Sequence, residues 1–154
     1  TAFIAVYFIG LFEATLQQKI ALAILMPVVA SMGGIAGTQT LIIVTRGIAT
    51  GRVTSANIKT LINKEVAVSG LNGIIWSVVI GLITYYWFSD LLLSLVIALA
   101  IITNLLVAAF SGAFLPLALT KLKIDPALAG GVILTTITDV IGFVAFLGLA
   151  ALFI

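Results

Sequence analysis

The chain has 154 residues, of which 63% are hydrophobic and 8% are charged, and its formal net charge is +2. A soluble domain carries about a quarter charged residues, so no water-soluble core could hide this much apolar surface. Because backbone groups inside a bilayer must pair within helices, we expect an all-α integral membrane protein, a helical bundle surrounded by the lipid bilayer. The small net charge, concentrated in the predicted loops, does not suggest nucleic-acid binding.

The chain contains no cysteine and no histidine. Disulfide bonds are therefore excluded, and the usual ligands of zinc and of softer metals are absent. Any metal ion must be held by oxygen atoms of carboxylates, amides, hydroxyls, the backbone or water. The sequence also has no nucleophile–base pair, phosphate-binding loop or metal-hydrolase spacing, so we do not expect an enzyme.

The first apolar run, residues 1–12, is too short to cross a membrane. It has no basic stretch before it and no small-residue cleavage site after it, which argues against a signal peptide. Since the chain also begins without methionine, we expect a fragment whose first helix is incomplete, with any soluble part upstream. A polar segment, residues 13–19, leads to the second helix.

The second predicted helix, residues 20–45, contains an unusual stretch of glycines and hydroxyls at residues 31–40. Gly33 and Gly37 form a small-xxx-small pair that lets another helix approach closely, and packing is the favoured interpretation for these glycines. For Gln39 and the neighbouring Thr38, two interpretations remain open: helix packing, and lining of a water-filled lumen. Helical spacing places a second polar stripe on one face, made of Ser31, Gly34, Thr38 and Thr45.

The next segment, residues 46–64, holds four of the seven basic residues: Arg46, Arg52, Lys59 and Lys64. Thr54 or Ser55 is suited to cap a short amphipathic helix over residues 56–63, ahead of a third span over residues 65–88.

The fourth span is predicted at residues 91–119 and carries Asn104, for which an interhelical hydrogen bond is favoured over lining a pathway. The fifth covers residues 126–154, with Asp125 as its N-cap. Basic residues are concentrated in the second-to-third and fourth-to-fifth loops, which the positive-inside rule places in the cytoplasm. We therefore expect five spans in a cell (inner or plasma) membrane, with the truncated N-terminus cytoplasmic and the C-terminus outside.

One carboxylate, Asp139, lies in the middle of the last span, which holds no other charge. That span is roughly 40 Å long as a helix, so Asp139 lies near the bilayer midplane, where an ionised carboxylate costs about 2.5–3.5 kcal/mol. Such a residue usually faces a bundle interior or a wet pathway. Helical spacing predicts a small, oxygen-bearing stripe from Gly131, Thr135, Asp139 and Gly142, flanked by Thr136 and Thr138.

This stripe suits a hard cation such as Mg²⁺, which binds through one or two carboxylates and keeps most of its water. The favoured interpretation is an ion or proton pathway. The alternatives are a protonated Asp139 hydrogen-bonded to a neighbouring helix and a proton-relay acid. One chain supplies one intramembrane acid, so a twofold axis would be needed to bring two carboxylates to one divalent ion, which favours a homodimer.

Two motifs resemble the pore helices of the MgtE family of magnesium channels. Residues 27–40 with Arg46-Gly47 are similar to the second transmembrane helix of that family, and residues 124–129 with 135–143 to the fifth. Shorter matches to the third and fourth helices are Lys64-Glu65 with residues 70–73, and residues 104–109. The resemblance runs in order over residues 1–154, which we therefore expect to be an MgtE-like transmembrane pore domain.

The resemblance implies a homodimeric, Mg²⁺-selective channel with five helices per subunit, in which the second and fifth helices line the pore. The ion-recognising aspartate of the family falls on Asp139, and a backbone carbonyl that helps to hold the hydrated ion falls on Thr135. Lower-ranked pore-lining positions are Gly131, Thr136, Thr138, Gly142, Ser31, Gly34 and Thr38. Mn²⁺, Co²⁺ and Ca²⁺ are further candidate ions for the same site.

The sequence departs from the family at Ile35 and Gly131, where members carry asparagine, so a polar contact to the water shell of the ion is expected to be missing. Cytoplasmic Mg²⁺-sensing domains that precede the first helix in full-length members are absent from residues 1–154. Two rival functions are a Na⁺- or H⁺-coupled divalent-cation exchanger of the same fold and a non-conducting membrane anchor or assembly subunit.

Overall fold

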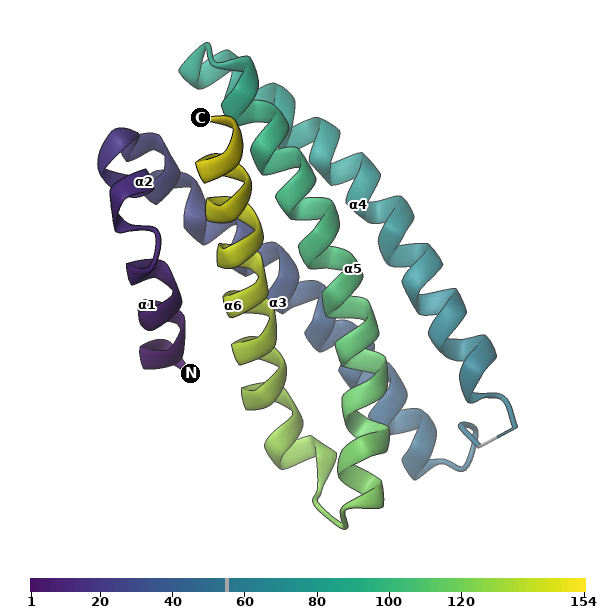
Figure 1. Ribbon diagram of the computed structural model, residues 1–154. Helices are drawn as coiled ribbons and strands as arrows, with labels where there is room; N and C mark the ends of the chain where they lie inside the picture. The colour runs from purple at the N-terminus through teal and green to yellow at the C-terminus, as the bar shows by residue number, and fades with distance from the viewer. Residues whose placement is uncertain (55) are drawn as a thin grey trace.

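A computed structural model describes residues 1–54 and 56–154, and within this part of the chain all regular structure is helical (Figure 1). This confirms the predicted all-α class. The helices are α1 (Ala2–Gly10), α2 (Glu13–Gln18), α3 (Ile20–Ala49), α4 (Ile58–Phe88), α5 (Leu91–Lys121) and α6 (Pro126–Phe153).

Among the described residues, four helices, α3 to α6, are long and apolar enough to cross a membrane. The first predicted helix corresponds to α1, whose nine residues are too few for a span. It lies alongside α6 (Figure 1). The polar segment that follows folds into the short helix α2, which connects α1 to α3.

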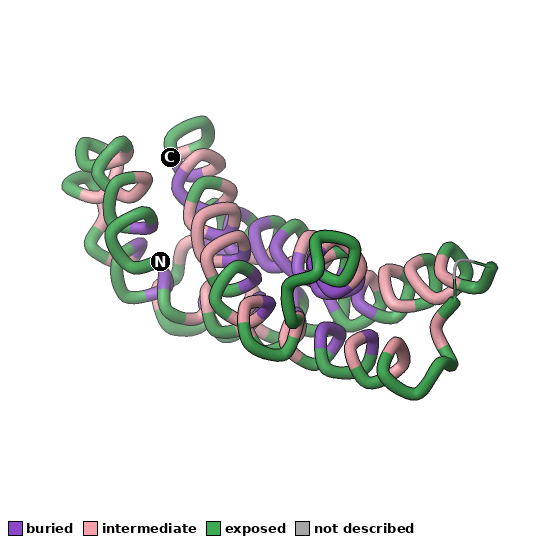
Figure 2. Tube along the Cα trace, turned by 90° about the horizontal axis from the view of Figure 1, so that it is seen from below, coloured by how far each residue is buried: buried purple, intermediate pink, exposed green. Residues whose placement is uncertain are grey.

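The long helices are arranged around α5, which packs against α3, α4 and α6. Helices α3 and α6 also pack on one another, whereas α3 and α4 barely touch. Figure 2 shows the buried segments on the sides that the helices turn toward one another and the exposed segments on their outer sides. The apolar core therefore forms where α3, α5 and α6 meet, through side chains that include Val29, Ile97, Ile101, Phe146 and Leu147.

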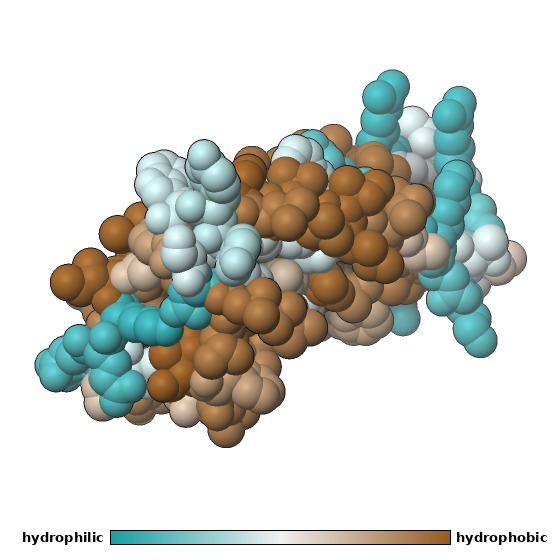
Figure 3. Space-filling view, turned by 90° about the horizontal axis from the view of Figure 1, so that it is seen from above, coloured by the Kyte–Doolittle hydropathy of each residue, from teal (hydrophilic) through white to brown (hydrophobic). Residues whose placement is uncertain are grey.

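The two predicted cytoplasmic loops, between α3 and α4 and between α5 and α6, lie at one end of the bundle, and the α4–α5 turn and the C-terminus lie at the other (Figure 1). Hydrophobic side chains cover the middle of the molecule in Figure 3, with hydrophilic ones toward the edges of the view. At the α4–α5 turn, Asp90 caps α5 through the Leu93 amide (3.0 Å) and forms an ion pair with Lys19.

The predicted break before the third span is wrong. The structure has one continuous α4 from Ile58 to Phe88, where we expected a short helix followed by a separate span. No glycine or proline interrupts residues 58–69, so nothing stops the helix there. Asn57 takes the N-cap position, and its side chain accepts a hydrogen bond from the Thr54 amide (2.8 Å). Ser55, the other proposed cap, lies outside the described residues.

Asn104 fixes the junction of α3, α5 and α6. Its completely buried side chain donates from Nδ2 to the backbone carbonyl of Val29 (2.8 Å), which confirms the predicted interhelical hydrogen bond. A Cβ added at Gly33 would lie 2.3 Å from that Nδ2, and one added at Gly142 would lie 2.6 Å from it. Both glycines are therefore needed for packing, as expected for Gly33, and they hold α3 and α6 in a fixed relation.

Candidate metal centre

A groove of about 520 Å³ lies between α3 and α6. Helix α6 contributes Thr135 and Asp139 to its lining, one helical turn apart. Helix α3 contributes two adjacent rows of side chains: Ala30, Ser31, Gly34, Ile35, Thr38 and Gln39. The polar stripe predicted on the second helix and the stripe that bears Asp139 therefore meet at one place.

Asp139 is half-buried in this groove. Within residues 1–54 and 56–154, no side chain or backbone group forms a hydrogen bond or an ion pair with its carboxylate. The ion pair found in this part of the chain joins Lys19 to Asp90. One alternative considered above was a protonated Asp139 that forms a hydrogen bond to a neighbouring helix. The described residues contain no partner for such a bond. The carboxylate oxygens remain available to a ligand in the groove.

The threonine hydroxyls of the groove donate their protons back to their own helices. Thr38 Oγ1 donates to the carbonyl of Gly34 (2.7 Å), and Thr135 Oγ1 donates to the carbonyl of Gly131 (2.8 Å). A hydroxyl that has used its single proton still carries two acceptor lone pairs. The lining around Asp139 is therefore rich in hydrogen-bond acceptors, which suits a ligand that presents donors.

Four other predicted pore-lining residues of α6 lie outside the lining of the groove. Thr138 and Gly142 belong to a fully packed row with Gly130, Leu134, Phe146 and Ala150 that faces α3 and α5. Thr136 is half-buried and donates to the carbonyl of Val132 (2.8 Å). Gly131 is half-buried beside open space, one turn before Thr135. The row that faces the groove thus steps by four residues through 131, 135 and 139, and Gly142 belongs to the adjacent row.

The backbone carbonyl of Thr135, which the family resemblance assigns to the ion, already accepts a hydrogen bond from the buried Thr138 hydroxyl (3.2 Å). A carbonyl oxygen has two lone pairs, and the helical hydrogen bond from residue 139 uses the other direction. The hydroxyl oxygen of Thr135 is therefore more available to a ligand in the groove than its backbone carbonyl oxygen is.

Three groove residues were not assigned to a pore wall from the sequence: Ala30, Ile35, and Gln39, for which packing and a lumen were both left open. Ala30 has no polar atom to mark it, and Ile35 was noted only as a departure from the family. A step of four residues from Ser31 leads to Ile35 and then to Gln39, so helical spacing alone could have found that row. Thr45, placed on the same face from the sequence, lies beyond the groove near the basic end of the bundle, where it lines a separate pocket that also includes Asp125.

Within the described residues no three acidic, histidine or cysteine side chains cluster as metal ligands. One copy of the chain therefore offers a cation one carboxylate, supplemented by hydroxyl, amide and backbone oxygens. Oxygen ligands of this kind fit Mg²⁺ with its water retained better than a dehydrated ion in an all-protein cage.

Comparison with known proteins gives a consistent result. Residues 26–149 match the profile of the MgtE family, described as divalent cation transporter. A protein of Bacillus subtilis named magnesium transporter MgtE is 37% identical over 146 residues, which is 95% of this chain and 32% of that relative. Proteins of the same name from Thermus thermophilus and Enterococcus faecalis are 32% and 28% identical, each over 92% of this chain and 31% of the relative.

The chain thus spans about a third of the length of the curated relatives that it matches. The matched part includes all of α4 and α5 and most of α3 and α6, and with them both walls of the groove.

Proposed function

Because this chain belongs to the MgtE family of divalent cation transporters, we propose that it conducts Mg²⁺ across the membrane through a channel formed by two copies. The observation that carries this proposal is the groove between α3 and α6. It holds the Asp139 carboxylate, which has no partner among the residues that the structure describes, within a membrane-spanning helix, where a carboxylate without a function would be costly.

The ion enters the groove in this proposal with its water shell retained. The water molecules around Mg²⁺ direct their hydrogen atoms outward, so a hydrated ion presents donors to its surroundings. The lining contains matching hydrogen-bond acceptors, namely the Asp139 carboxylate and the hydroxyl oxygens of Thr38 and Thr135. Since Mg²⁺ dehydrates reluctantly, a wall that binds the water shell avoids a large barrier and still lets the ion leave.

Two copies are needed because one groove supplies a single carboxylate. A twofold axis parallel to the helices would place two grooves opposite one another, with the paired Asp139 carboxylates on either side of the ion. Their two negative charges match the charge of one Mg²⁺ and would repel one another in its absence. Ile35, which lines the groove and is 60% exposed, is the apolar side chain that this contact would cover.

The proposed topology places the end with the α3–α4 and α5–α6 loops in the cytoplasm, because that end carries six of the seven basic residues. The C-terminus then lies outside. Helix α1, which packs along α6, counts in this proposal as part of a fifth span.

The direct test is Mg²⁺ uptake into liposomes that contain the protein, with no counter-ion gradient. We expect uptake by the wild type and its loss in Asp139→Asn. Glu13→Gln, the same carboxylate-to-amide change at an exposed site of α2, is the matched control and should leave uptake intact. Equal uptake by wild type and Asp139→Asn would remove the carboxylate from the mechanism. Uptake that appears only with an imposed Na⁺ or H⁺ gradient would replace the channel with an exchanger.

A further inference from the structure

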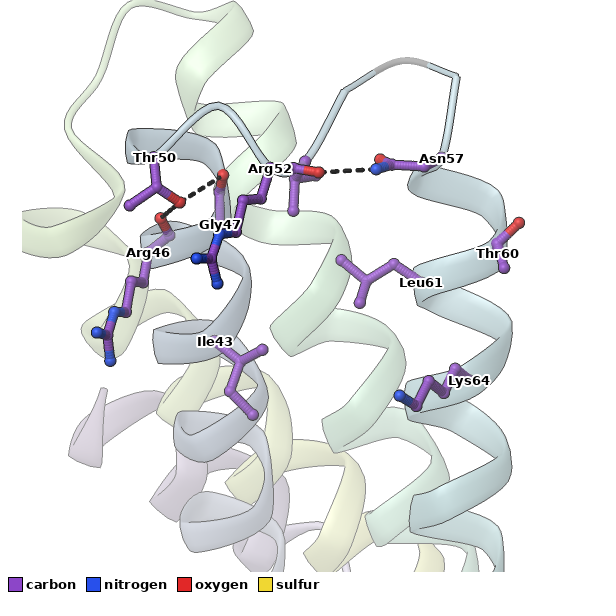
Figure 4. A pocket seen from close by; sticks show the side chains of 10 residues that line it. Ile43, Arg46, Gly47, Thr50, Arg52, Asn57, Thr60, Leu61 and Lys64 are labelled. Carbon is purple, nitrogen blue, oxygen red and sulfur yellow. Dashed lines mark hydrogen bonds between the residues drawn. The ribbon is translucent and has the colours of Figure 1, made fainter.

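A second concave site lies at the basic end of the bundle, away from the Asp139 groove. It is a pocket of about 660 Å³ between the end of α3, the loop that follows and the first turns of α4. Three cationic side chains line it, Arg46, Arg52 and Lys64, and no acidic side chain does. Figure 4 shows the charged ends of Arg46 and Arg52 turned back from the loop along α3, with the Lys64 amine on the facing side of α4.

The pocket is built by a well-bonded loop. Asn57 donates from its side chain to the carbonyl of Arg52 (2.7 Å) and accepts from the Thr54 amide (2.8 Å). The amides of Arg52 and Val53 both donate to the carbonyl of Gly47 (2.9 and 3.0 Å). A Cβ at Gly47 would lie 2.4 Å from the Val53 side chain, so the loop folds tightly over the end of α3. The backbone that carries Arg52 is therefore held in place.

The three cations have no counter-charge among the residues that the structure describes, since the ion pair found there joins Lys19 to Asp90 at the opposite end. Glu65, the acid next to Lys64, accepts a hydrogen bond from Thr40 (3.3 Å) and does not line the pocket. The N-terminus of α4, whose Asn57 and Thr60 line the pocket, adds positive dipole to the same space. The lining of the pocket therefore carries net positive charge and favours an anionic ligand.

We propose that this pocket binds the phosphate-bearing headgroup of an anionic phospholipid. The position favours lipid because the pocket lies where two membrane helices leave the bilayer, and the cations are turned back along the helices. Two apolar side chains, Ile43 and Leu61, line the pocket among the cations, and Ile43 is 52% exposed. These two side chains offer apolar contact to the acyl-chain end of a lipid whose headgroup meets the cations.

The test is lipid binding by the purified protein in neutral detergent, followed through the thermal stabilisation that a bound ligand produces. Short-chain phosphatidylglycerol is the probe, and short-chain phosphatidylcholine and inorganic phosphate are the comparisons. We expect phosphatidylglycerol to raise the melting temperature, phosphatidylcholine to leave it unchanged, and phosphate to act only at much higher concentration. Stabilisation by phosphate at the same concentration as the lipid would assign the pocket to a soluble anion and overturn the proposal.

Variants test whether the pocket carries the effect. Arg52→Gln and Lys64→Gln should each weaken phosphatidylglycerol binding about fivefold, and the double variant about 25-fold. Lys59→Gln removes the same charge at an exposed site of α4 that does not line the pocket, and it should bind like the wild type. Equal weakening by Lys59→Gln would show a diffuse surface attraction and would contradict the proposal.

A last variant separates binding from folding. The charge-conserving double change Arg52→Lys with Lys64→Arg should keep lipid binding, because the phosphate still meets two cations. If Arg52→Gln unfolds, Lys64→Gln still decides the matter, since the Lys64 side chain is exposed and makes no hydrogen bond within the described residues, so its loss should not disturb the fold.

Discussion

Asn104 and Asp139 have side chains of nearly the same shape, and both lie inside the membrane part of the bundle, yet their surroundings are opposite. Asn104 is enclosed at the junction of three helices, touches two glycines and donates to the Val29 carbonyl. Asp139 lies in an open groove of the same α3–α6 pair and has no partner within the described residues. The two sites show how the bundle treats a polar group that builds structure and one that is left for a ligand.

The contrast extends to glycines on the same helices. Gly33 and Gly142 pack against Asn104, whereas Gly34 and Gly131, on the groove-facing rows, have no atom within 4 Å of an added Cβ. One face of each helix is thus filled to contact and the adjacent face is left open. The predictions below compare the two faces, beginning with the largest effect.

Exchanging amide and carboxylate at the two sites should have opposite consequences. Asn104→Asp must either stay ionised beside the Val29 carbonyl or take up a proton at neutral pH, and either route costs roughly 3–5 kcal/mol of unfolding free energy. Asp139→Asn should change that free energy by less than about 0.5 kcal/mol while abolishing Mg²⁺ uptake. Denaturation in detergent measures the unfolding free energy of the two variants, and the stability of Asn104→Asp should recover at acidic pH. Equal destabilisation at the two positions would show that Asp139 is structural.

The glycine rows give the next largest difference. Gly33→Ala forces its Cβ against Asn104 and should cost about 1–3 kcal/mol. Gly34→Ala, the adjacent position with open space, should be neutral or stabilising by up to about 1 kcal/mol, because alanine favours the helix. Thermal unfolding of the two variants side by side provides the measurement. Similar melting temperatures would mean that the Asn104 junction is not tightly packed.

Ile35 tests whether the groove wall recognises the water shell of an ion. Ile35→Asn adds a donor and acceptor to a wall position that is 60% exposed, and it should strengthen Mg²⁺ binding about fivefold, the effect of one net hydrogen bond. Ile35→Leu, which adds no polar atom, is the control. Mg²⁺ titration of thermal stability reports the affinity. An unchanged affinity for Ile35→Asn would place the ion away from this row.

The smallest effect is expected outside the membrane, at the α4–α5 turn. The Leu93 amide and then the Lys19 side chain hold the pKa of Asp90 below its ordinary value. A carboxylate with a lowered folded-state pKa contributes stability above the unfolded pKa of about 4, and that contribution is lost as the pH falls through the folded-state value. Asp90→Asn should lower stability at neutral pH by about 0.5–1 kcal/mol and reduce its decline in acid.

A double-mutant cycle with Lys19→Gln provides the check on that turn. Coupling between Lys19 and Asp90 should appear at neutral pH, vanish in acid and weaken at high salt, where the half-buried pair is partly screened. Additive effects at neutral pH would mean that the ion pair contributes nothing and that Asp90 acts only as the cap of α5.

The intramembrane position of Asp139, the polar stripe on α3 and most helix ends could be predicted from the sequence because each has a local signature. A charge in an apolar run, a cluster of hydroxyls and an Asp-Pro helix start can all be read without knowing the packing. The structure corrected what depends on neighbours. Gly142, three residues from Asp139, belongs to the packed row because Asn104 occupies the space beside it. Helical spacing identifies adjacent rows on a helix, but it does not show which row is packed against a neighbour and which is left open. The continuous helix over residues 58–64 is a different case, since the absence of glycine and proline there could have been read from the sequence.

The measurement that tests the central claim most directly is the number and hydration of divalent ions held by the purified protein. Mn²⁺ can replace Mg²⁺ for this purpose, and electron–nuclear double resonance in heavy water counts the water molecules on it. The account predicts one tightly held Mn²⁺ for every two chains, with its water shell retained, and none in Asp139→Asn. One ion per chain, an ion bound directly by the carboxylate, or undiminished binding in Asp139→Asn would contradict it.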